Sequence, residues 1–140
     1  MTTALYFNRG KIAAFGADLY AARVTHNGEP LAPAERLTDL SAPGANDAGQ
    51  SVRTDGREIL FWSDRVGTAG DADIWVSTRS SAHGAWSPPV NLGSVINAEF
   101  AEERPNLSHD GRTLFFDSLR PGGVDDSQDI WMSTRRPSGH

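Results

Sequence analysis

The sequence predicts an all-β chain of antiparallel strands built from copies of one unit. Three observations lead to this fold class. First, the stretch from Gln50 to Arg79 recurs from Glu103 to Arg135, and each copy has an Asp-Gly turn, an apolar run and an Asp-Ile-Trp-x-Ser-Thr-Arg ending. Second, no segment carries the long 3.6-residue apolar period of a helix. Third, Asp-Gly and Asn-Gly pairs, which favour hairpins, separate the apolar runs.

The repeat period is about 55 residues, measured from Gly56 to Gly111. A less regular first copy opens the chain and carries Asp18-Leu19-Tyr20 in place of Asp-Ile-Trp. Repeats of roughly this length with several short strands are typical of propeller blades. We therefore expect a single partial propeller-type domain, an incomplete ring with blade units at about 1–46, 47–101 and 102–140.

The strands follow from the apolar runs and from the turn residues between them. The run Ile59-Leu60-Phe61-Trp62 has no polar interruption, so we expect both faces of that strand to be buried between neighbouring blades. Asp55-Gly56 and Asp110-Gly111 should each close a hairpin, with both glycines at positive φ. In chain order, the expected strands are 4–7, 18–24, 36–40 (an edge strand), 50–53, 59–62, 73–79, 90–92 (an outer strand), 104–108, 113–116 and 129–134.

This pattern resembles the TolB-type, WD-like β-propeller repeat. The resemblance rests on Ser108-His109-Asp110-Gly111-Arg112-Thr113-Leu114-Phe115-Phe116, on Asp129-Ile130-Trp131 and on Trp86-Ser87-Pro88-Pro89-Val90-Asn91-Leu92-Gly93. It covers nearly the whole chain and implies a fold, because these motifs are structural and carry no catalytic residues. The departure is length: complete relatives form rings of about six blades, and this chain holds about two and a half.

Composition excludes several classes of function. The formal net charge is −5, from 13 basic and 18 acidic residues, which argues against a nucleic-acid or anionic-membrane surface. The chain has no Cys, so disulfides, thiol catalysis and Cys-ligated zinc are excluded. We expect no cofactor. The N-terminus carries no signal-peptide pattern, which predicts a cytoplasmic chain as it stands, or a periplasmic or secreted one within a longer exported propeller.

Candidate binding residues can be named by position alone. Asp47, Glu102, Glu103 and Arg104 lie where strands enter the expected central end of the blades. A glycosidase would need two such carboxylates facing one another across a pocket, and the sequence does not show whether any two converge. A weaker alternative is a calcium site at Asp125, Asp126 and Asp129, although their spacing matches no calcium-loop signature.

Other candidates have simpler structural interpretations. An aromatic recurring once per blade, as Trp75 and Trp131 do, is more often inter-blade packing than a ligand contact. The Asp of each Asp-Ile-Trp more often bonds a backbone N–H in the preceding turn. The histidines are expected in solvated loops, because no two lie at a metal-ligand spacing: His26, His83, His109 and His140.

The leading functional hypothesis is a non-catalytic binding or scaffold module for a protein or peptide partner. The alternatives are a carbohydrate-binding or glycoside-hydrolysing propeller and a propeller fragment with no independent role. An open arc leaves its two terminal faces uncovered, and we expect Leu5, Phe7, Phe116 and Trp131 on them. Large exposed apolar patches usually mark interfaces. The sequence therefore predicts a homodimer that closes a ring, or a chain that aggregates alone.

Overall fold

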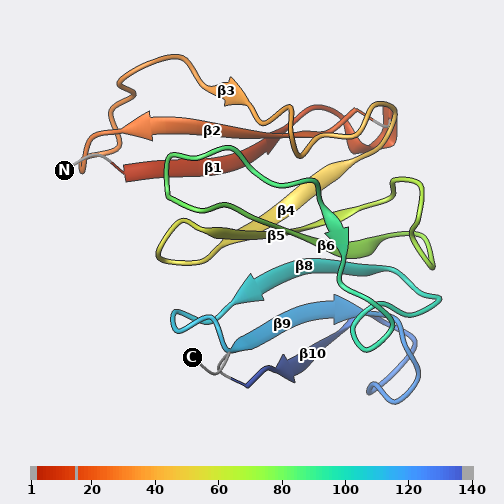
Figure 1. Cartoon of the computed structure of the whole chain (residues 1–140). Coiled ribbons are helices and arrows are strands. Elements are labelled where there is room, and N and C mark those ends of the chain that lie inside the picture. Colours follow the sequence, from red (N-terminus) through yellow and green to blue (C-terminus); the bar gives the residue numbers. More distant parts are fainter. Residues whose placement is uncertain (1–2, 15, 137–140) are drawn as a thin grey trace.

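The computed structural model describes residues 3–14 and 16–136. Within these residues the chain forms three antiparallel sheets of three, four and three strands, and one short helix, η1 (Ile12–Ala14). The sheets succeed one another from the N-terminus to the C-terminus as an arc that does not close (Figure 1). The predicted fold class, propeller-type blades in an incomplete ring, is confirmed. No helix among the described residues is long and apolar enough to cross a membrane.

The first sheet has its strands in sequence order, and its last strand is shorter than predicted. Residues after Arg36 leave the expected 36–40 strand because they turn, with the Leu40 amide donating to the Leu37 carbonyl at 3.0 Å. The three strands are β1 (Thr3–Arg9), β2 (Asp18–Val24) and β3 (Glu35–Arg36).

The second sheet is the complete blade and also keeps sequence order. Every residue of its second strand is buried, which confirms that Ile59 to Trp62 is covered on both faces. The strand starting near residue 50 begins earlier than predicted, at Asp47. The four strands are β4 (Asp47–Val52), β5 (Glu58–Ser63), β6 (Asp73–Thr78) and β7 (Val90–Asn91).

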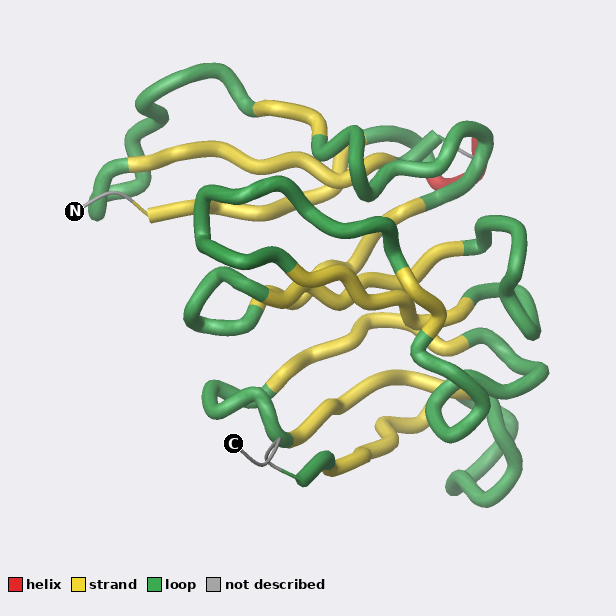
Figure 2. Tube along the Cα trace, in the orientation of Figure 1, coloured by secondary structure: helices red, strands yellow, loops and turns green. Residues whose placement is uncertain are grey.

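The third sheet repeats the first three strands of the second. In both sheets the first strand carries an irregularity of register, between Ala48 and Ser51 in one and between Glu103 and Asn106 in the other. Figure 2 shows the two sheets with corresponding loops at corresponding ends. The three strands are β8 (Glu102–Leu107), β9 (Thr113–Ser118) and β10 (Asp129–Thr134).

The Asp-Gly turns have the predicted geometry. Gly56 and Gly111 both have a φ of 70°, a conformation that glycine adopts without a steric penalty. The Gly56 amide donates to the Arg53 carbonyl and the Gly111 amide to the Ser108 carbonyl, each at 2.8 Å. The alignment of the repeats on these turns is therefore confirmed.

Two apolar clusters hold the sheets together. The first joins sheets one and two, and the second joins sheets two and three. Trp75 belongs to the first cluster and Trp131 packs against the second, so both recur as inter-blade residues, as predicted. They are not equally buried: Trp75 is 8% exposed, whereas Trp131 is half-buried. Trp131 lies in β10, the last strand of the arc, which has a neighbour on one side only among the described strands.

One prediction about the terminal faces is wrong. Phe116 and Trp131 do not form the uncovered face of the third sheet, because they point back toward the second sheet and join its cluster. Side chains alternate along a strand, so the outer face is formed by their neighbours Phe115, Ile130 and Met132. At the other end, Leu5 is 53% exposed and Phe7 half-buried, as expected of an uncovered face.

Candidate functional site

Two of the four candidate residues are structural supports. Asp47 and Glu102 stand at the start of β4 and β8, and both are 0% exposed. Asp47 accepts from the Ala42 amide at 2.8 Å, and Glu102 accepts from the Ala98 amide at 2.8 Å. Each carboxylate therefore fastens the loop that leads into its own strand, and neither reaches solvent.

Each of these carboxylates also holds an arginine. Arg65 bonds Asp47, and Arg120 lies 3.2 Å from a Glu102 oxygen. Both guanidinium groups also donate to a carbonyl of the preceding blade, that of Leu40 and that of Ile96 respectively. The chain thus repeats a buried acid–arginine pair at each junction between sheets. Its sequence signal was present, since both arginines precede the Gly-rich link of the repeat, but its role was not predicted.

The same arginines cover the repeated aromatics. The Arg65 guanidinium carbon lies 5.1 Å from the centroid of Phe61 and 5.2 Å from that of Trp75. Arg120 stands in the same relation to Phe116 and Trp131, at 5.0 and 5.4 Å. Partly buried cation–π contacts of this kind are worth about 0.5–2 kcal/mol each. They explain why arginine is retained at these positions without invoking a ligand.

The other two candidates reach the surface. Glu103 is half-buried on β8. Arg104 is exposed, and its guanidinium donates to Asp117 at 2.5 Å and to Gln128 at 3.1 Å. Its φ of 49° makes it the only non-glycine residue with a positive φ in the described part of the chain. The four candidates therefore do not converge on one pocket.

The acidic link of the third repeat closes turns. Asp125 accepts from the Ser127 amide at 2.8 Å, and hydrogen bonds from Ser127 lower the pKa of Asp125. Asp129 accepts from the Val124 amide at 3.0 Å, as Asp73 does from that of Ala69 at 2.8 Å. The predicted turn-bonding role of this Asp is thus confirmed in both repeats.

No metal centre is assembled in residues 3–14 and 16–136. There, no group of three or more His, Asp or Glu side chains is arranged to hold a metal ion, and Asp126 is exposed. His26, His83 and His109 are exposed and lie in turns, as predicted, and His140 lies outside the described residues.

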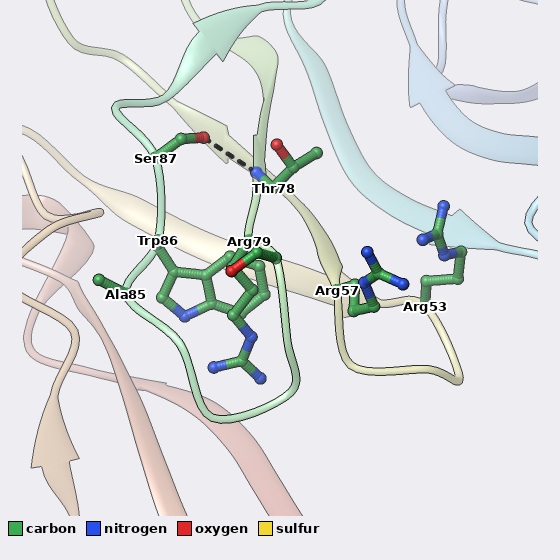
Figure 3. Close-up of a pocket in the computed structure, with 8 residues that line it drawn as sticks. Arg53, Arg57, Thr78, Arg79, Ala85, Trp86 and Ser87 are labelled. Atoms are coloured by element: carbon green, nitrogen blue, oxygen red, sulfur yellow. Dashed lines mark hydrogen bonds between the residues drawn. The ribbon is translucent and has the colours of Figure 1, made fainter.

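An arginine-rich recess that the sequence did not reveal opens at the edge of the second sheet where the Asp-Gly turn lies. Its volume is about 540 Å³. Three separate segments meet there: the β4–β5 turn, the end of β6 and the stretch before β7 (Figure 3). Its lining is Arg53, Arg57, Thr78, Arg79, Ser80, Ala85, Trp86 and Ser87.

Arg79 builds the wall of this recess and has little freedom to bind anything else. Its Nε donates to the Gly56 carbonyl at 2.6 Å, and one terminal nitrogen donates to the Tyr6 hydroxyl at 2.8 Å. Its guanidinium carbon stands 4.0 Å from the centroid of Trp86, which is 8% exposed. Figure 3 shows Arg79 next to Trp86, with Arg57 and Arg53 to one side.

Arg57 supplies the accessible charge of the recess, whereas Arg53 is already paired with a carboxylate. Arg53 donates two hydrogen bonds to Asp55, at 2.9 and 2.7 Å, and these bonds lower the pKa of Asp55 to about 2. Arg57 is exposed and takes part in no ion pair among the described residues. The lining holds three arginines and no carboxylate, so the recess is locally basic on a chain of formal net charge −5.

A wider groove of about 960 Å³ continues from the recess toward the first sheet. It shares Arg53, Arg79, Ala85 and Trp86 with the recess and extends past Tyr6 to β2 and β3. The two hollows therefore form one channel-like surface across the junction of sheets one and two.

The comparisons with known proteins identify the fold and do not identify a function. No protein-family model matches the chain, and no curated protein sequence matches it either. Among solved structures it is similar to a thermostable family-43 glycoside hydrolase, with 12% identity, a TM-score of 0.59 and 99% of this chain covered. It is also similar to TolB from Acinetobacter baumannii, with 18% identity, a TM-score of 0.54 and 94% covered. The chain spans 56% and 27% of those two proteins, so it is a partial, propeller-type all-β fold.

Proposed function

We propose that this chain is a non-catalytic β-propeller-type module that binds a protein or peptide partner through the arginine-rich recess. The observation that carries the proposal is the set of donors at one edge of the second sheet. Arg57 and Arg53 stand beside the hydroxyl-bearing residues Thr78, Ser80 and Ser87. Guanidinium groups pair with carboxylates through two parallel N–H···O bonds, so the recess fits an acidic side chain or a C-terminal carboxylate.

The adjoining groove supports an extended segment as the ligand. It leads from the recess past Tyr6 to β3, whose outer edge pairs with no other strand among the described residues. A peptide with an acidic group in the recess would continue along this groove. Its contacts there would be weaker and less specific, because Arg23 and Arg36 are balanced by Glu35 and Asp39 in the lining.

The carbohydrate interpretation receives less support from the geometry. Sugar sites use aromatic faces, and the aromatic face in the recess, Trp86, is already covered by Arg79. Hydrolysis needs two carboxylates across a pocket, and Asp47 and Glu102 are both fully buried and bonded within the fold. The likeness to a glycoside hydrolase is one of fold at 12% identity and brings no activity with it.

A binding measurement with a matched control tests the proposal. A fluorescent acidic hexapeptide should bind the purified chain, and a hexapeptide with Gln and Asn in place of its acidic residues should not. Arg57→Ala should weaken binding at least about fivefold, equivalent to roughly 1 kcal/mol. Arg112→Ala is the control, because Arg112 holds the same position in the next Asp-Gly turn, is exposed, and lies outside the recess.

The salt dependence and a sugar panel complete the test. Binding should weaken as ionic strength rises, because exposed charge pairs are screened. Equal binding of acidic and neutral peptides, or equal losses in Arg57→Ala and Arg112→Ala, would contradict the proposal. Binding of an oligosaccharide that survives Arg57→Ala would favour the carbohydrate interpretation instead.

A further inference from the structure

The third sheet presents an apolar row on its outer face. Ile130 is 76% exposed, Met132 62% and Phe115 40%. Met132 and Phe115 face each other across the strand pair β9–β10, and Ile130 lies two residues along the same strand. Scattered exposed apolar residues are ordinary, but a contiguous row on a sheet face marks a contact surface.

The second sheet shows what covers such a row. One repeat earlier, Leu60, Ile74 and Val76 occupy the places of Phe115, Ile130 and Met132, as the pairing of Leu60 with Val76 confirms. There the row is covered: Leu60 and Ile74 are buried and Val76 packs with them against Leu114 and Phe116 of the third sheet. An outward row of this type is thus covered, inside the chain, by the opposite face of the next blade.

The first sheet has the equivalent of that opposite face, and no other sheet of the described residues covers it. Leu5, Phe7 and Tyr20 occupy the places of Ile59, Phe61 and Trp75, because Phe7 pairs with Tyr20 as Phe61 pairs with Trp75. Phe7 and Tyr20 stack with ring centroids 5.9 Å apart. Arg9 lies over both rings, at 5.6 and 5.0 Å, as Arg65 lies over its aromatic pair.

Charge at the two faces is also complementary. Arg9 lies at the end of β1 beside the aromatic pair of the first sheet. On the outer face of the third sheet, Glu103 pairs in register with Asp117. Both positions lie at the same edge of the blades. Arg9 pairs with Asp18, and Asp117 is next to Ser118, which pairs with Asp129. Asp18 and Asp129 are the same position of the repeat. Asp117 already bonds Arg104, whereas Glu103 takes part in no ion pair among the described residues. The basic Arg9 on one face therefore meets Glu103 on the other.

We propose that a second copy of this chain covers both faces head to tail, with the outer face of its third sheet on the outer face of the first sheet. Two such contacts, related by a two-fold axis, place six sheets in one closed ring, within the four to eight blades of known propellers. The inference is independent of the proposed function, because the recess lies on neither face.

The internal contacts predict which residues meet. In the junction of sheets one and two, Ile59 and Leu19 belong to one cluster, and in the next junction Leu114 and Ile74 do. Ile59 and Leu114 are the repeat equivalents of Leu5, and Leu19 and Ile74 are the repeat equivalents of Ile130. Between copies, Leu5 should therefore lie close to Ile130, so that a charge at either position disrupts the contact and opposite charges at both restore it.

Sedimentation velocity of the full chain tests this proposal. The wild type should sediment as a dimer at about 100 µM and dissociate on dilution. Ile130→Arg and Leu5→Glu should each weaken self-association at least about tenfold, and an equimolar mixture of the two should recover a dimer, because one junction is native and the other pairs Arg with Glu. Both residues are exposed, so circular dichroism should be unchanged in either variant, and so should thermal unfolding at dilutions where the wild type is a monomer.

Val124→Arg is the matched control, because Val124 is 92% exposed in a loop of the same sheet and away from the apolar row. It should leave the dimer intact. A wild-type monomer at that concentration, or a ladder of species beyond the dimer, would overturn the closed ring. A dimer that survives Leu5→Glu would also overturn it, since the contact would then not join the two opposite faces.

Discussion

Gly49 and Arg104 occupy the same position in consecutive sheets, at the register irregularity of β4 and of β8, and both have a positive φ, 62° and 49°. The bend is thus a property of the repeat and not of the side chain. In the second sheet a glycine adopts the conformation without penalty. In the third an arginine adopts it, and for a non-glycine residue the left-handed region costs roughly 1–2 kcal/mol.

Replacing Arg104 should therefore reverse the usual ranking of Gly and Ala in a strand. We expect Arg104→Gly to be more stable than Arg104→Ala by about 1 kcal/mol, because both lose the Asp117 ion pair and only glycine relieves the backbone. Urea denaturation measures the difference. Asn106 provides the control on the same strand, exposed and without a positive φ. There Ala should be the more stable of the two, and the same order at both sites would contradict the interpretation.

Gly49 itself tests the conformation together with close packing. A Cβ at Gly49 would lie 2.7 Å from Cδ1 of Trp62, a rigid ring, whereas a Cβ at Gly44, with a φ of 75°, would have nothing within 4 Å. Gly44→Ala should cost about 1 kcal/mol, the backbone penalty alone. Gly49→Ala should cost about 2–4 kcal/mol, because the clash is added. Equal losses in thermal unfolding would mean that Trp62 moves freely.

The repeat accounts for how much of the fold was predictable. Asp55-Gly56 and Asp110-Gly111 located the turns, and the unbroken run from Ile59 located the doubly covered strand, because these are local signals that the fold did not override. The bend at Gly49 and Arg104 has no such local signal, because one copy has a glycine at this position and the other has an arginine of the kind common on protein surfaces. Its backbone conformation appears only when β4 and β5 are paired.

The candidate site was harder to predict for a different reason. Asp47 and Glu102 lie at the starts of strands, as predicted. A sequence alone does not distinguish a carboxylate there that faces a ligand from one that bonds its own loop. The pairing with Arg65 and Arg120, which recurs at the repeat period, is the sequence signal that separates the two. The recess had no comparable signal, because Arg57, Arg79 and Trp86 meet only when three separate segments fold together.

Trp75 and Trp131 should differ in what they contribute to stability, although they are repeat equivalents. Trp75→Ala should cost about 3–5 kcal/mol, since the side chain is 8% exposed within the first cluster. Trp131→Ala should cost less, about 1–3 kcal/mol, because Trp131 is half-buried and β10 has a neighbouring strand on one side only among the described strands. Denaturant midpoints of the two monomeric variants, measured in the Ile130→Arg background, give the comparison. A larger loss at Trp131 would place the hydrophobic core elsewhere.

The Arg53–Asp55 pair predicts a dependence of stability on pH. The pKa of Asp55 is lowered from 3.8 to about 2, chiefly by the hydrogen bonds from Arg53. Because the folded pKa lies below the unfolded one, the stabilisation is present above about pH 4 and is lost as pH falls through about 2. The stability difference between wild type and Asp55→Asn should therefore shrink from pH 6 to pH 2.5, and shrink also in 1 M salt at pH 6. A difference that is constant with pH would contradict the pairing.

The buried carboxylates allow a last prediction that separates structure from catalysis. Glu102 accepts from Ser118 at 2.7 Å and from the Ala98 amide, so Glu102→Gln should destabilise the fold by about 1–3 kcal/mol, as the loss of a buried charged acceptor does. Glu103→Gln changes a half-buried group whose carboxylate takes part in no ion pair among the described residues, and should leave stability within about 0.5 kcal/mol. We expect no release of product from aryl glycosides or peptide substrates by the wild type. Turnover that disappears in Glu103→Gln while its unfolding curve stays unchanged would show that the chain is an enzyme, and would make the binding-module proposal wrong.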